Sequence, residues 1–252
     1  MRRTDYDSVA PRYDLRYRTT GLAGVEQALR VFVGDAAPAL EVGAGTGHWL
    51  ARLGGPVSGL DPSAQMLAGA RRKAPMALLV RGRAEELPYR DAALARVFCI
   101  NAIHHFDARS RFLAEAARVL RPGGGLLVVG LDPAAGTDRW WIYDHFPGTR
   151  ELDRERHPPA ALLRGELAAA GLERVESWQA EHLRLQVPAS EAQAHGFLDR
   201  AFASQLAVLT DEEYRRGVQR IAHASALAEA RGDRLLLETD IRLLATSGWR
   251  PR

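Results

Sequence analysis

Three glycines at alternate positions are the first residues in this chain whose type and spacing suggest chemistry. Gly43, Gly45 and Gly47 fall in a turn between an apolar run, which predicts a buried strand, and a segment with helical spacing. Glycine allows positive φ angles and lets the backbone come close to a ligand. The free N–H groups at the start of a helix favour an anionic group. The turn therefore predicts an anion site, and a tight turn without a ligand is the alternative.

The spacing of these glycines argues against a dinucleotide. The pattern is G-x-G-x-G, whereas a dinucleotide turn has its third glycine one position later, where this chain carries His48. A carboxylate therefore suits the turn better than a pyrophosphate. An NAD-dependent oxidoreductase is a poor interpretation of this sequence.

An acidic residue lies where the next predicted strand ends. Asp61 closes the strand predicted over 57–61, 14 residues after Gly47, and Pro62 precedes a helix predicted over 64–73. In open α/β sheets, ligands bind at the carboxyl ends of the strands, and an acid there can accept both hydroxyls of a ribose. Taken alone, Asp61 would more often cap the following helix. Because the glycine turn lies upstream, we interpret Asp61 as a ribose ligand.

The candidate site residues must be positioned by strands and helices. The sequence patterns typical of strands and of helices alternate over 36–131. The predicted strands cover 57–61, 76–80, 94–100 and 126–129, and the predicted helices cover 21–33, 64–73 and 109–120. The strands are almost continuously apolar, which predicts a parallel sheet covered by helices on both faces. After residue 131 we predict a helix over 158–170, a strand within 172–187, two helices within 188–231 and a last strand over 235–245. No linker divides the chain, so we expect a single domain.

Composition narrows the class of protein. The chain has 252 residues, a single cysteine (Cys99) and a formal net charge of +3. One cysteine excludes an internal disulfide, and the mild charge does not demand a nucleic acid partner. The apolar runs are too short to span a membrane, and the N-terminus lacks the apolar core of a signal peptide. We expect a cytoplasmic protein, a monomer or homodimer, and no metal site, because the histidines lack ligand spacing.

Five motifs in order give the chain a family resemblance. They occupy residues 41–47, 59–63, 82–88, 101–105 and 118–124. With them the chain resembles class I S-adenosylmethionine-dependent methyltransferases, of the small-molecule type grouped with the enzymes of ubiquinone and menaquinone biosynthesis. The resemblance extends from about Tyr6 to Leu131 and is faint beyond. An RNA or protein methyltransferase, and a non-catalytic S-adenosylmethionine-binding protein, stay open as alternatives.

The resemblance implies a Rossmann-like α/β fold. Its sheet is mostly parallel and seven-stranded, with an antiparallel last strand, helices on both faces and helical cap insertions. Within one domain over 1–252, it implies N-terminal lid helices over 1–33, a cofactor-binding core over 36–131 and substrate cap elements over 132–170 and 188–232. S-adenosyl-L-methionine would be the cofactor and S-adenosyl-L-homocysteine the product.

The resemblance also assigns residues to the cofactor. The glycines would line its methionine part, with Glu41 stabilising the turn and the cationic end. Asp61 would take the ribose hydroxyls, while the backbone of Ala84 and the side chain of Glu85 would reach the adenine. The full set implied to bind the cofactor is Glu41, Gly43, Ala44, Gly45, Gly47, Asp61, Pro62, Ala84, Glu85, Asn101 and Tyr13.

Methyl transfer from a sulfonium is an in-line displacement, which asks little of the protein beyond alignment of the acceptor and exclusion of water. A base is needed only where the acceptor holds its proton tightly. His104 and His105 are the nearest catalytic candidates, either as a base or as groups that shape the pocket. We predict that Tyr6, Tyr143 and His145 contact the small-molecule substrate.

Overall fold

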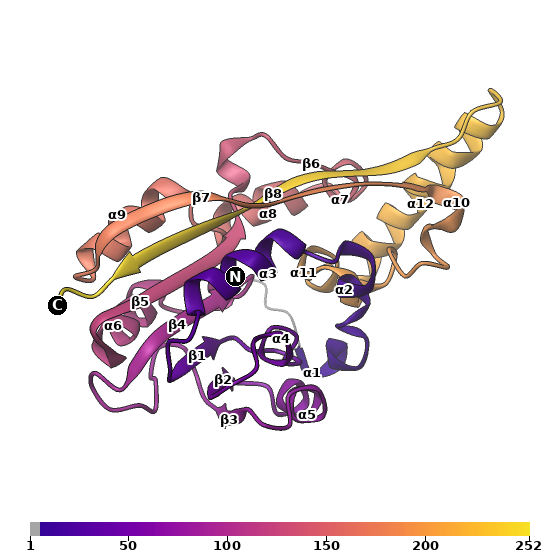
Figure 1. The fold of residues 1–252 in the computed structure, drawn as a ribbon. Coiled ribbons are helices and arrows are strands. Elements are labelled where there is room, and N and C mark those ends of the chain that lie inside the picture. The colour runs from indigo at the N-terminus through magenta and orange to yellow at the C-terminus, as the bar shows by residue number, and fades with distance from the viewer. Residues whose placement is uncertain (1–5) are drawn as a thin grey trace.

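The computed structural model describes residues 6–252. Within them the chain forms an eight-stranded sheet (Figure 1). The strand order is β3-β2-β1-β4-β5-β8-β6, and β7 also pairs with β8. Its parallel strands are β1 (Ala39–Val42), β2 (Val57–Asp61), β3 (Leu78–Arg81), β4 (Leu94–Ile100) and β5 (Leu120–Leu131). The predicted parallel sheet is confirmed. The bounds predicted for β2 and β4 are those observed.

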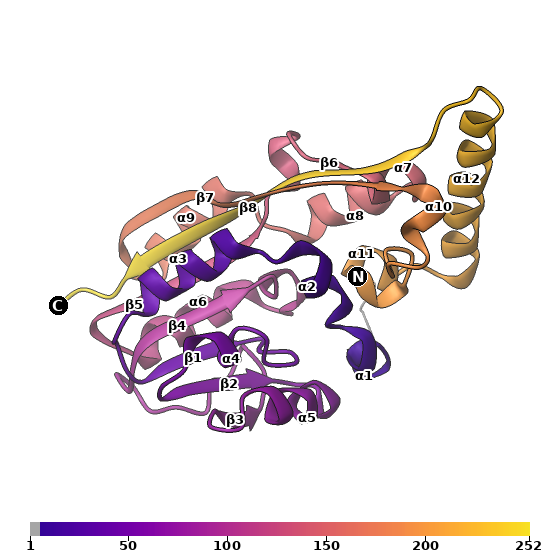
Figure 2. The same ribbon diagram turned by 45° about the vertical axis from the view of Figure 1, so that its right-hand side comes forward.

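The antiparallel strands are β6 (Arg139–Trp140), β7 (Glu173–Pro188) and β8 (Leu236–Trp249). β8 runs antiparallel to β5, which confirms the predicted antiparallel last strand, and pairs with β7 along its whole length. The sheet has eight strands rather than the predicted seven, because the two-residue β6 also pairs with β8. In Figures 1 and 2 the β7–β8 ribbon extends beyond the parallel strands.

Helices cover both faces of the sheet, as predicted. They are α3 (Ala23–Val33), α4 (Leu50–Leu53), α5 (Ala64–Lys73), α6 (Arg109–Val119) and α9 (Ala160–Ala169). Successive strand residues point to opposite faces. Leu126 and Val128 of β5 therefore share one buried core with α6 and α9. Leu127 and Val129 share the other with α3 and α4.

A third core belongs to the cap, the segments that surround the far end of the ribbon (Figure 2). The cap comprises α7 (Trp141–His145), α8 (Thr149–Arg156), α10 (Ala189–Ala192), η4 (Arg200–Phe202), α11 (Ser204–Ala207) and α12 (Asp211–Glu229), with η3 (Pro133–Ala135) before them. Two helices were predicted within 188–231, but only α12 is long. Its start is fixed by a capping box in which Thr210 and Glu213 exchange hydrogen bonds.

The N-terminal segment crosses from the core to the cap. It consists of α1 (Tyr6–Val9), η1 (Ala10–Arg12) and α2 (Leu15–Thr20), and the first five residues of the predicted lid lie outside the described part. On the core side, Ser63 Oγ donates to Asp7 Oδ1 at 2.5 Å. On the cap side, the Arg12 guanidinium pairs with Asp199 at 2.8 Å. Among the described helices, none is long and apolar enough to cross a membrane.

Candidate active site

The main cavity, of about 430 Å³, lies at the carboxyl ends of β1, β2 and β4 beneath the N-terminal segment. Thirteen of the residues predicted for a site line it: Tyr6, Tyr13, Glu41, Gly43, Ala44, Gly45, Asp61, Pro62, Ala84, Glu85, Asn101, His104 and His105. Parallel strands bring their carboxyl ends to one edge of a sheet, so motifs distant in sequence meet there.

The glycine turn follows β1, and all three glycines have positive φ, at 77°, 52° and 76° for Gly43, Gly45 and Gly47. L side chains rarely adopt this conformation. A Cβ on Gly47 would lie 2.9 Å from Cα of Ala70 in α5, so this glycine permits close helix packing and does not line the cavity. Among the described residues, the nearest atom to a Cβ on Gly45 would be a carbon of the Tyr13 ring, at 3.7 Å. The backbone approach is therefore open at Gly45.

Asp61 is the buried acid at the end of β2. Its Oδ2 accepts from the N–H of Gly45 and its Oδ1 from the N–H of Ser63, each at 2.9 Å. Burial raises the pKa of Asp61, while these two N–H groups oppose the rise. The cap of α5 is Ser63, whose Oγ accepts from the N–H of Met66 at 3.0 Å. The helix-cap alternative for Asp61 is therefore wrong.

Glu41 is a second buried carboxyl group, on β1, and is 1% exposed. Its Oε2 has no hydrogen-bond partner among the side chains and backbone that the structure describes. Burial and the nearby charge of Asp61 raise the pKa of Glu41 well above its usual range. An ammonium group in the cavity would donate a hydrogen bond to the unpartnered oxygen. Its positive charge would also stabilise the ionised form of Glu41.

The helix after the glycine turn is shorter than its pattern suggested. α4 is a single turn, so it offers less of an oriented dipole than a long helix. Thr46 in the turn is held from two sides: its Oγ1 donates to Asp14 Oδ1 at 2.6 Å and accepts from Lys73 Nζ at 2.9 Å. Lys73 also pairs with Asp14. These contacts fasten the N-terminal segment over the turn.

Tyrosines of the N-terminal segment form the roof of the cavity. Tyr13, predicted to bind the cofactor, and Tyr6, predicted to contact the substrate, both line this cavity. Tyr17 joins them, its ring stacked on His48 with centroids 3.4 Å apart. The Tyr6 hydroxyl is hydrogen-bonded to Nε2 of His105. No local pattern distinguishes Tyr17, because three tyrosines in a helical segment do not reveal which ones face a ligand.

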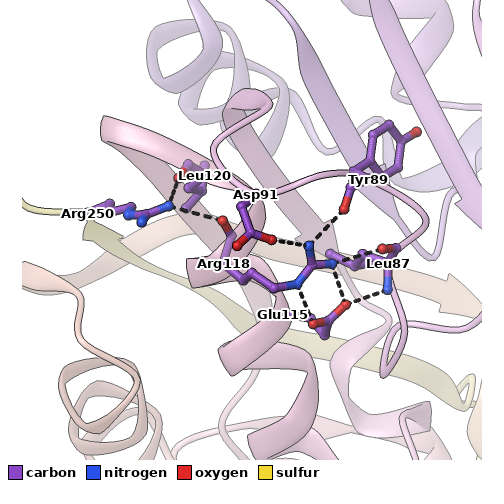
Figure 3. Close-up of polar contacts among 7 residues, drawn as sticks. All are labelled: Leu87, Tyr89, Asp91, Glu115, Arg118, Leu120 and Arg250. Atoms are coloured by element: carbon purple, nitrogen blue, oxygen red, sulfur yellow. Dashed lines mark hydrogen bonds and ion pairs between the residues drawn. The ribbon is translucent and has the colours of Figure 1, made fainter.

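The loop that carries Ala84 and Glu85 is held in place by hydrogen bonds. Glu85 Oε1 accepts from the N–H groups of Asp107, at 2.6 Å, and Ala108, at 3.2 Å. Figure 3 shows how Arg118 anchors the far end of the same loop. Its guanidinium donates to the carbonyls of Leu87 and Tyr89, at 3.0 and 2.8 Å. The motif over 118–124 therefore supports the loop and lines none of the described cavities.

His104 and His105 lie on the 3-10 turn η2 (Ile103–His105) that follows β4. His104 is 6% exposed, and neither of its ring nitrogens has a hydrogen-bond partner within the described chain. Burial, with help from neighbouring histidines and arginines, lowers its pKa well below the usual range. Burial and the charge of Arg156 lower the pKa of His105 to about 3. Both rings are therefore neutral near pH 7.

A second cavity, of about 100 Å³, shares the wall formed by Asn101, His104 and His105 with the main one. Its other side consists of the ribbon and the cap, with Trp140, Leu183, Leu185, Phe202, Gln205 and Ile241 among its lining residues. Tyr143 and His145 were predicted to contact substrate, but they line none of the described cavities. The Tyr143 hydroxyl instead donates to the buried Asp153 at 2.8 Å.

Sequence reasoning missed several polar residues at these cavities, and the most deeply buried of them outside the five motifs are Arg156, His157 and Gln205. Each is at most 3% exposed. They lie outside the five motifs, so no local pattern distinguishes them. Cys99 is fully buried in β4, where it packs as a small apolar residue of the core. The described residues hold no group of histidine, cysteine or carboxylate side chains that could bind a metal ion.

Comparisons with known proteins agree with this geometry. A family model described as a methyltransferase domain matches residues 40–128. The ubiquinone/menaquinone biosynthesis C-methyltransferase of Acidiphilium cryptum (strain JF-5) is 32% identical over 203 residues, 68% of this chain and 82% of that protein. The phthiotriol/phenolphthiotriol dimycocerosates methyltransferase of Mycobacterium leprae (strain TN) is 37% identical over 133 residues, 50% of this chain and 49% of its own length.

Solved structures share the fold. A protein of Anabaena variabilis ATCC 29413, described as a methyltransferase from an antibiotic biosynthesis pathway, superposes with a TM-score of 0.69 at 23% identity, over 89% of this chain and 96% of that one. Phosphoethanolamine N-methyltransferase 2 of Haemonchus contortus superposes with a TM-score of 0.59 at 16% identity, over 98% of this chain and 57% of that one. At these identities, the likeness extends to the fold alone.

Proposed function

The chain belongs to the class I S-adenosylmethionine-dependent methyltransferases that act on small molecules, and we propose that its main cavity holds the cofactor and its second cavity the acceptor. The enzyme transfers a methyl group from S-adenosylmethionine to a small-molecule acceptor. When bound, the cofactor supplies an electrophilic methyl group on a sulfonium. The residues of the chain orient the two molecules and exclude water.

The observation that carries this assignment is the unit formed by the glycine turn, Asp61 and Glu41. The space left by the missing side chain at Gly45 leaves room for the cofactor's amino-acid part, and the unpartnered oxygen of Glu41 suits its ammonium. Asp61 is fixed by two N–H groups and retains lone pairs that can accept ribose hydroxyls. Ala84 and Glu85, on the far wall, would contact the adenine.

The acceptor site follows from the wall that both cavities share. Asn101 and His104 line both cavities, so an acceptor in the second cavity would meet the cofactor's methyl group beside them. The tyrosine roof over this point would keep water out. The second cavity is lined largely by apolar side chains of the ribbon and the cap, which suits an acceptor with an apolar body.

We propose that His104 and His105 hold the acceptor by hydrogen bonds and do not act as general bases. A base works best when its pKa lies near the operating pH, and the pKa values of both rings are well below 6.5. Their neutral rings can still donate or accept one hydrogen bond per nitrogen. We therefore assign them to orientation of the acceptor.

Two further expectations stay proposals. We propose a cytoplasmic location, because the lone Cys99 gives the chain no use for an oxidising compartment. We also propose no nucleic acid partner, because a net charge of +3 over 252 residues is small.

A labelled methyl donor tests the proposal. The protein would be incubated with methyl-labelled S-adenosylmethionine and a small-molecule metabolite extract, and labelled products would be identified by mass. We expect one dominant labelled product that Asp61→Ala reduces strongly. Tight cofactor binding without any labelled product across a broad metabolite panel would favour the non-catalytic alternative.

A further inference from the structure

A buried arginine lies where the two cavities meet. Arg156 is the last residue of α8, is 3% exposed and lines the main cavity. Next to it in the chain, His157 lines the second cavity. The His157 ring stacks on the ring of His104, with centroids 3.9 Å apart. Arg156 therefore lies at the point where we place methyl transfer.

The protein does not use all the hydrogen-bond donors of Arg156. Its Nη2 donates to Asp153 Oδ1 at 2.7 Å. Its Nε is buried and has no acceptor among the described residues. A guanidinium has five N–H donors and always carries its charge, so a buried one without acceptors is costly. An acceptor atom supplied by a ligand in the cavity would remove that cost.

The carboxylate that pairs with Arg156 also accepts hydrogen bonds from other side chains. Asp153 is fully buried, and its Oδ2 accepts from the Tyr143 hydroxyl at 2.8 Å and from Gln205 Nε2 at 2.7 Å. Its carboxylate therefore holds three side chains of the cap together, with Arg156 on Oδ1 and the other two donors on Oδ2. The pairing also fixes the guanidinium in one place.

Arg16 supplies a second guanidinium close to the junction of the two cavities. Arg16 of the N-terminal segment lines the second cavity and donates to the Tyr13 hydroxyl at 3.2 Å and the carbonyl of Ala201 at 3.3 Å. The charges of Arg16 and Arg156 both lower the pKa of His104 and of His105. Two guanidiniums thus act on the histidines that the cavities share, inside low-dielectric walls, and an anion bound between them would be favoured.

We propose that the methyl acceptor carries an acidic oxygen, of the carboxylate, phenolate or enolate class, which binds as the anion to the Arg156 guanidinium. Its apolar part occupies the second cavity against Leu183, Leu185 and Phe202. A planar guanidinium binds such oxyanions with short, charge-assisted hydrogen bonds. This inference rests on the proposed function and adds the chemical class of the acceptor and the residue that selects it.

Two isosteric probes that differ in charge test this inference. The protein, saturated with S-adenosylhomocysteine, would be titrated by calorimetry with 2-naphthoate and with 2-naphthamide. We expect the acid to bind about tenfold or more tightly than the amide, the range of a hydrogen bond to a charged group. In Arg156→Gln this preference should fall to near unity. In Arg154→Gln, an exposed arginine of the same helix, it should persist.

Three outcomes would overturn the inference: equal or weaker binding of the acid, no binding of either probe, or a preference that survives Arg156→Gln. If Arg156→Gln does not fold because Asp153 loses its charged partner, the wild-type comparison still decides the charge preference. Arg156→Lys keeps the ion pair and should keep part of that preference. Affinity for S-adenosylhomocysteine is measured separately, and its absence would contradict the proposed function instead.

Discussion

The carboxylate of Asp61 accepts a hydrogen bond from the backbone N–H of Gly45, with 2.9 Å between Gly45 N and Asp61 Oδ2. This contact joins the turn after β1 to the end of β2, because the two strands are parallel neighbours in the sheet. The acid and the open backbone are therefore one unit. Removal of either should disturb the same ligand.

Asp61→Ala should weaken binding of S-adenosylhomocysteine tens-fold or more. A hydrogen bond to a charged group contributes about 1.5–3 kcal/mol, and the variant also leaves the Gly45 N–H without its partner. Isothermal calorimetry on the folded variant measures the change, with Asp35→Ala at an exposed acid as the control. Unchanged affinity would refute the ribose assignment.

Gly45→Val should abolish cofactor binding while the fold persists. At a φ of +52° an L side chain adds strain of about 1–2 kcal/mol, and its branches would enter the cavity. Gly136→Val is the matched control, since Gly136 has a φ of +70° and open space around it. Both variants should lose similar stability in thermal unfolding, but only Gly45→Val should lose affinity. Wild-type affinity in Gly45→Val would contradict the close backbone approach.

Acid should destabilise the folded protein partly through His105. Its pKa falls from 6.5 to about 3 on folding, mainly because the ring is buried. Between these values the unfolded chain binds the proton and the folded chain does not, so stability is complete above pH 6.5 and falls as the pH drops toward 3. In His105→Asn, the drop in melting temperature between pH 7 and pH 5 should be smaller than in the wild type. An equal drop would show that His105 does not contribute.

Tyr143→Phe should cost stability without changing cofactor binding. The variant removes one of the donors to the buried Asp153, and such a loss costs about 1–3 kcal/mol. Denaturant unfolding and calorimetry with S-adenosylhomocysteine separate the two effects. A large loss of affinity with unchanged stability would restore Tyr143 to the ligand site.

The core was predictable because its signals are local. The bounds of β2, β4 and α5 match their predictions, since an apolar run or a helix start is encoded within a few residues. β5 begins at Leu120 rather than at the predicted residue 126. The Arg-Pro-Gly-Gly sequence there argues against a strand, and only pairing with β4 and contact with the C-terminal end make one.

The acceptor side was not predictable, because its contacts join distant residues. Gln205 reaches Asp153 across 52 positions, and Arg12 reaches Asp199 across 187. The spacing of apolar residues is a local pattern and does not indicate such long-range contacts. Substrate contacts were predicted in the segment over 140–146 because it is rich in aromatic residues. Of this segment, only Trp140 lines a described cavity, whereas Tyr143 faces the interior of the cap.

The most direct test of the account is a crystal structure with S-adenosylhomocysteine bound. The account predicts the amino-acid part of the ligand at the glycine turn beside Glu41, the ribose on Asp61 and the adenine by Ala84. Electron density for the ligand at any other place, or a main cavity left empty at saturating ligand, would contradict it.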